Sequence, residues 1–132
     1  MHLHFDGNYA TSILLAFLII VFLQSGIDKV KDWKGNLSWL VGHFEKSPLK
    51  NSVPLLLAIV TVAELAAGFL SLIGLVHLLF FNDSSFAFYG ALVSALSLLM
   101  LLFGQRIAKD YEGAKTIVIY LVPTVFLLFL LQ

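Results

Sequence analysis

One carboxyl group stands alone in a long apolar stretch of the sequence. Glu64 is the only residue among Asp, Glu, Lys and Arg between Val53 and Phe81. A helix that entered a bilayer at Val53 would carry Glu64 to a depth of about 16 Å, since each helical residue adds 1.5 Å. A carboxylate facing lipid there costs at least about 2.5–3.5 kcal/mol, so we expect Glu64 to face the interior of a helix bundle. Two roles are open for it there. One is an interhelical hydrogen bond that fixes packing, and the other is that of a proton acceptor or a partner of a quinone carbonyl.

Small and hydroxyl-bearing residues share the helical face of Glu64, and such residues let a second helix come close. They are Thr61, Ala67, Gly68 and Ser71. The later apolar segments bring hydroxyl groups, and no Lys or Arg, to a comparable depth. These hydroxyl-bearing residues are Ser94, Ser97, Tyr120 and Thr124. We expect them to hydrogen-bond Glu64, and we expect its carboxyl to be protonated, because a desolvated acid without a cation favours the neutral form.

A second group of polar residues lies where apolar segments end. Its members are Gln24, Asp28 and Lys29 at the end of the first segment, and Gln105, Arg106 and Asp110 after the third. Separately solvated charges, with long side chains that reach the surface, are the first interpretation of this group. The alternatives are an ion pair of Arg106 with Asp28 or Asp110 that ties the helix ends together, and a pocket for an anionic headgroup or a quinone ring.

Composition restricts the classes of protein to which these residues can belong. The chain of 132 residues is 60% apolar and 12% charged, whereas soluble domains are about 45–50% apolar and about 25% charged. A soluble globule and a disordered chain are excluded, and a net charge of zero argues against nucleic-acid binding. The absence of cysteine excludes disulfides, thiolate metal sites and iron–sulfur ligation. No metal-binding or cofactor motif is present, which leaves a quinone or a lipid as the expected small-molecule ligand.

Four apolar segments are long enough to span a bilayer, which takes about 20 helical residues. They cover residues 10–27, 53–81, 86–104 and 115–131. Backbone groups in lipid must be hydrogen-bonded within the segment, so these spans are helices. The sequence therefore predicts an all-α fold, a single integral membrane domain built as a four-helix bundle.

The basic residues predict the orientation of this bundle. All eight lie in or beside two connections: Lys29, Lys31, Lys34, Lys46 and Lys50 in the first, and Arg106, Lys109 and Lys115 in the third. The positive-inside rule places both connections in the cytoplasm. The chain is thus predicted to be a multi-pass protein of the bacterial inner membrane with both termini in the periplasm.

The first connection contains a further helical pattern over residues 33–46. Apolar residues recur there at helical spacing, which predicts a short amphipathic helix lying in the headgroup plane on the cytoplasmic face. Trp33 and Trp39 would anchor it at the interface. A docking surface for a partner protein is the alternative.

Three stretches of this sequence carry a family resemblance that covers nearly the whole chain. They are FLQSGIDK at 22–29, ELAAG at 64–68 and GQRIAKDYEGA at 104–114. In this order they resemble the DoxX-like family of small four-helix bacterial membrane proteins. The resemblance implies motifs that converge on the cytoplasmic half of one bundle. Some relatives are named for a membrane subunit of thiosulfate:quinone oxidoreductase.

These observations predict a membrane protein without catalytic activity of its own. The first hypothesis is an accessory subunit of a larger membrane assembly, in contact with lipid and with other membrane-protein subunits, in a respiratory or quinone-linked oxidoreductase complex. The alternative is a quinone-binding component in which Glu64 handles the proton, together with Tyr120 and Arg106. A conductor of protons or small solutes is the third hypothesis, for which the sequence supplies only isolated hydroxyl groups.

Overall fold

The computed structural model describes residues 8–132, and within that range the chain forms helices and no strands. The helices are α1 (Tyr9–Lys31), α2 (Trp33–His43), the short 3₁₀ helix η1 (Lys50–Ser52), α3 (Val53–Phe81), α4 (Ser85–Ile107) and α5 (Tyr111–Leu131). This confirms the all-helical prediction. The helices α1, α3 (with η1), α4 and α5 are long and apolar enough to cross a membrane, as in a multi-pass membrane protein.

Three of the long helices extend beyond the apolar segments that the sequence marks out. Helix α1 continues to Lys31, α4 continues to Ile107, and α5 begins at Tyr111. Lys, Arg and Gln are good helix formers, so a helix continues through charged residues at which an apolar segment stops. Residue Lys29 therefore lies on α1 and not in a loop.

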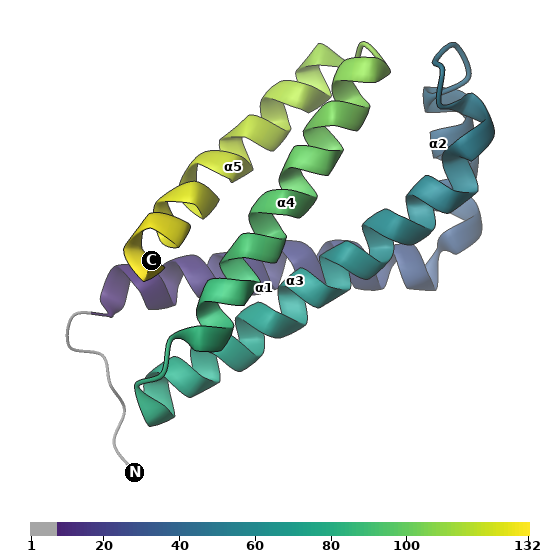
Figure 1. Ribbon diagram of the computed structural model, residues 1–132. Helices are drawn as coiled ribbons and strands as arrows, with labels where there is room; N and C mark the ends of the chain where they lie inside the picture. Colours follow the sequence, from purple (N-terminus) through teal and green to yellow (C-terminus); the bar gives the residue numbers. More distant parts are fainter. Residues whose placement is uncertain (1–7) are drawn as a thin grey trace.

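The helices run up and down and bring both basic connections to one end of the bundle. Figure 1 shows α2 and the α4–α5 connection at the same end, and the α3–α4 turn and the C-terminus away from it. A hydrogen bond of 2.8 Å between His43 Nε2, on α2, and Gln105 Oε1, near the end of α4, joins the two connections. The positive-inside rule requires the two lysine- and arginine-containing connections to lie on the same side of a membrane, and their position at one end of the bundle meets this requirement.

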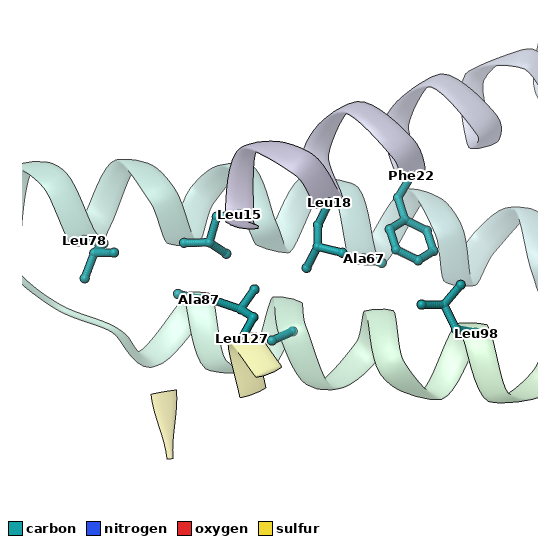
Figure 2. Packing of buried hydrophobic residues seen from close by; sticks show 9 residues of the cluster. Leu15, Leu18, Phe22, Ala67, Leu78, Ala87, Leu98 and Leu127 are labelled. Carbon is teal, nitrogen blue, oxygen red and sulfur yellow. The ribbon is translucent and has the colours of Figure 1, made fainter. Parts of the chain in front are cut away.

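Buried leucine and alanine residues form the core where the four long helices meet (Figure 2). The backbones of α3 and α4 come especially close. A Cβ atom added to Gly74 would lie 2.5 Å from the backbone of Ala87, and one on Gly90 would lie 2.8 Å from the backbone nitrogen of Ser71. Such contact needs residues without side chains, and it holds α3 and α4 as a tight hairpin.

Short polar residues begin and end the helices. Asp32 accepts a hydrogen bond from Gly35 N at the start of α2, and Asp110 accepts one from Gly113 N at the start of α5. In the α3–α4 turn, Asp83 accepts hydrogen bonds from the backbone and the hydroxyl of Ser85, which hold the pKa of that carboxyl below its ordinary value.

Candidate functional site

The carboxyl group of Glu64 is buried in the bundle and faces an ammonium group. Its side chain is 5% exposed, and its Oε1 lies 2.9 Å from Lys29 Nζ. Apart from this ion pair, Oε1 has no hydrogen-bond partner among residues 8–132. The hydrogen bond of Lys29 goes instead to Ser25 Oγ, one turn back on α1, at 2.7 Å. The result is an ion pair whose carboxylate keeps unused acceptor capacity.

The antiparallel course of α1 and α3 explains why these two side chains meet. Helical side chains lean toward the N-terminus of their own helix. Lys29 lies near the C-terminal end of α1, so its side chain points back into the bundle. Glu64 lies on the antiparallel helix α3, so its side chain leans toward the N-terminal end of α3, which is the end of the bundle where α1 stops. Gly26 also lies against Leu65, which brings the two helices close at this level.

The expectation that hydroxyl groups hold a protonated Glu64 is not supported by the geometry. Ser94 Oγ donates to Gly90 O, Ser97 Oγ donates to Val93 O, and Thr124 Oγ1 donates to Tyr120 O, all within their own helices. A helical Ser or Thr can reach the carbonyl one turn back, and in these three residues that carbonyl, not the Glu64 carboxylate, accepts the hydrogen bond. The premise that no cation reaches this depth is wrong, because Lys29 does.

Glu64 lines a cavity of about 290 Å³, which we call the Glu64 pocket. Its polar residues are Gln24 and Ser25 from α1, Glu64 from α3 and Tyr120 from α5, and its walls include Phe22, Leu98 and Ile117. The ring of Tyr120 stacks on Phe17, with 5.9 Å between the centroids. A space with an unsatisfied carboxylate and several polar partners is suited to hold water or a hydroxyl group.

Lys29 lines a second cavity of about 200 Å³, which we call the α2 slot. It lies between α2, α3 and α4, with walls that include Trp39, Phe44, Leu57, Val60 and Met100. The polar groups along it are those of Lys29, His43 and Gln105. The ion pair therefore lies between two cavities of different character, because Lys29 lines the apolar slot and Glu64 lines a pocket that contains several polar residues.

Comparison with family models, curated proteins and solved structures finds no match to this chain.

The second polar group is divided between different roles. Lys29 and Gln105 line the α2 slot, and Gln24 lines the Glu64 pocket. Asp28 is exposed. Asp110 caps α5 and lies 3.6 Å from His43 Nε2.

In the part of the chain that the structure describes, Arg106 forms no ion pair with Asp28 or Asp110. Among residues 8–132, the guanidinium of Arg106 lies over the ring of Tyr111, at 4.7 Å from the centroid. Arg106 is exposed and lines neither cavity, so it does not belong to a site with Glu64 and Tyr120. The carboxylate of Asp110 accepts the hydrogen bond of Gly113 N at the start of α5. Arg106 instead makes a cation–π contact with the neighbouring ring of Tyr111.

His43 is a member of the site that sequence reasoning missed. It stacks on Trp39, with 4.5 Å between the ring centroids, and hydrogen-bonds Gln105 across the mouth of the slot. Its position one turn after Trp39 was a signal that both side chains share a face of α2. In the part of the chain that the structure describes, no group of three His, Asp or Glu residues could hold a metal ion; His2 and His4 lie outside that part.

Proposed function

We propose that the chain is a quinone-binding accessory subunit of a respiratory or related oxidoreductase assembly in the bacterial inner membrane, and a member of the DoxX-like family. The observation that carries the proposal is the buried Lys29–Glu64 pair, in which Lys29 lines an apolar cavity and Glu64 lines a second cavity that contains several polar residues. A protein that only filled space between subunits would have no need of paired charges in its interior, since they cost desolvation energy.

The pair has the chemistry that quinone reduction needs from a protein. A quinone that becomes a quinol takes up two electrons and two protons. The two electrons, and the proton for one carbonyl oxygen, would come from the side of a redox subunit of the assembly. This chain would supply the path for the proton that goes to the other carbonyl oxygen. Lys29 can donate to a carbonyl oxygen, and Glu64 can take a proton from the Glu64 pocket and restore Lys29. Both groups are close enough for this exchange.

Replacing Glu64 with Gln tests the proton-handling role, because it keeps the shape and removes the exchangeable charge. We expect quinone reduction by the purified assembly to fall by about 100-fold, the lower end of what a positioned acid or base contributes, with bound quinone retained. The measurement is the rate of quinone reduction, together with the quinone extracted per protein.

Ser71→Ala is the matched control for this experiment. Ser71 lies two turns along the same face of α3, and its buried Oγ has no hydrogen-bond partner within the range 8–132. We expect this variant to keep the parental rate. Unchanged quinone reduction in Glu64→Gln would remove Glu64 from the mechanism.

The subunit role predicts partners that survive gentle extraction. Mass spectrometry of material purified in a mild detergent should find other membrane subunits and a quinone with this chain. A lone protomer without quinone, and intact respiratory complexes in a deletion strain, would refute the proposal.

The proposed orientation, with both termini in the periplasm, rests on the lysines and arginines at one end of the bundle. The cysteine-free chain allows a direct test with single cysteines at exposed positions. We expect Ser84→Cys, in the α3–α4 turn, to react with an impermeant maleimide in spheroplasts. Glu45→Cys, after α2, should react only after lysis. The reverse pattern would invert the topology.

A further inference from the structure

The α2 slot has the size of a ring system. An apolar cavity of 150 Å³ in a protein stays dry and binds benzene, and the slot measures about 200 Å³ with almost entirely apolar walls. One ring or two fused rings fit such a space, whereas the body of a two-chain lipid does not. The aromatic side chains of Trp39 and Phe44 line the slot, and flat rings pack well against them.

The polar edge of the slot offers donors to a ligand. His43 Nε2 and Gln105 Oε1 are 2.8 Å apart, and because an amide oxygen only accepts, His43 is the donor in this bond. The Gln105 amide nitrogen then remains as a donor. The Lys29 ammonium carries three protons, and its partners are Ser25 and Glu64. A ligand at this edge is therefore one that accepts hydrogen bonds.

The charges around the slot select for a neutral ligand. The ammonium of Lys29 is compensated by Glu64 at 2.9 Å, and Asp110 lies 3.6 Å from His43. An anionic headgroup would meet no uncompensated positive charge among these residues. The chemistry that fits the slot is an uncharged ring with a carbonyl group.

We propose that the α2 slot is a binding site for a neutral ring ketone, whose carbonyl oxygen accepts a hydrogen bond from Lys29. The statement that the natural ligand is a quinone rests on the proposed function. The ring of this ligand sits under α2 and not in the Glu64 pocket. Because the same ammonium is the ion-pair partner of Glu64, a carbonyl that binds Lys29 weakens its hold on Glu64 and frees the carboxylate to take up a proton.

A matched pair of synthetic probes tests this site without any quinone. The ketone 4′-bromoacetophenone and its analogue 1-bromo-4-ethylbenzene have the same shape, and only the first has a carbonyl oxygen. Bromine quenches tryptophan fluorescence on contact, and Trp39 lines the slot, whereas Trp33 does not. The experiment titrates each probe into the Trp33→Phe protein in nanodiscs, and the Trp39→Phe protein reports quenching from the bilayer alone.

We expect saturable quenching of Trp39, with the ketone binding about three- to tenfold more tightly than the ethyl analogue at equal concentration in the bilayer. Gly104→Leu should abolish it by filling the slot. A Cβ at Gly104 meets only Phe44 Cζ, at 3.7 Å, so the residue can be enlarged without a clash at that atom. Gly42→Leu is the matched control, because a Cβ at Gly42 meets nothing within 4 Å.

The donor role of Lys29 is tested in the double variant Lys29→Met with Glu64→Leu, which leaves no unpaired charge. We expect this protein to bind both probes and to lose the preference for the ketone. A retained preference would refute the role of Lys29, and equal, linear quenching in the Gly104→Leu and parental proteins would refute the site.

These outcomes separate the inference from the proposed function. Saturable ketone binding in a protein that carries no quinone from the cell would support the slot and refute the quinone subunit. Quinone that copurifies equally with Gly104→Leu would support the subunit and refute the slot as its site.

Discussion

Replacing Lys29 with Met should destabilise the protein more than replacing Glu64 with Leu. Removing one partner of a buried ion pair costs about 3–5 kcal/mol, because the other charge is left unpaired. Glu64 can limit this loss only by taking up a proton, which itself costs free energy at neutral pH, since its short side chain is fixed in the bundle interior and is 5% exposed. In Glu64→Leu, Lys29 avoids most of this loss, because it is 18% exposed near the end of α1 and its long side chain can carry the ammonium to the surface. Unfolding of both variants in lipid bicelles measures the difference.

The double variant Lys29→Met with Glu64→Leu separates the effect of charge from that of packing. Removing both charges should restore the free energy of unfolding to within about 1 kcal/mol of the parental value, because apolar replacements of a buried pair are often neutral or stabilising. If the double variant were as unstable as Lys29→Met alone, packing of the lysine stem would be the cause, and the ion pair would not explain the loss.

The pair also shows how far the sequence determines this site. The isolation of Glu64 among apolar residues was sufficient to place it inside the bundle, and the small residues on its face were sufficient to predict a close neighbouring helix. Its partner was not predictable from hydropathy, because Lys29 follows the apolar segment and was assigned to a connection. The spacing of Ser25 and Lys29, one helical turn apart, was the available signal that α1 continues.

The cavities depend on contacts between residues that are distant in sequence. The pattern in the first connection indicated a helix, and the structure has α2 at Trp33–His43. Periodicity alone did not reveal that Trp39, His43 and Phe44 turn toward α3 and α4 and line a slot. Whether Trp33 and Trp39 also anchor α2 at the membrane interface stays a prediction. The hairpin of α3 and α4 was predictable, because its connection is too short for any other course.

Adding a single methyl group at Gly74 should weaken the α3–α4 hairpin. A Cβ there would lie 2.5 Å from Cα and N of Ala87 and 2.9 Å from the carbonyl carbon of Phe86. These are backbone atoms, which cannot rotate away, so the helices must separate along their contact. We expect Gly74→Ala to lower the free energy of unfolding by about 1–3 kcal/mol, as overpacking does in well-packed cores, in a bicelle unfolding assay.

The opposite sign is expected for the same substitution at Gly42, in the exposed part of α2. A Cβ there meets no atom within 4 Å, so Gly42→Ala should gain up to about 1 kcal/mol of helix propensity. Adding Ala87→Gly to Gly74→Ala should not restore stability, because the clash is with the backbone of residue 87 and not with its side chain. Recovery in that double variant, or a neutral Gly74→Ala, would mean that the two helix backbones are not in contact. The hairpin would then have to be held by its larger side chains instead.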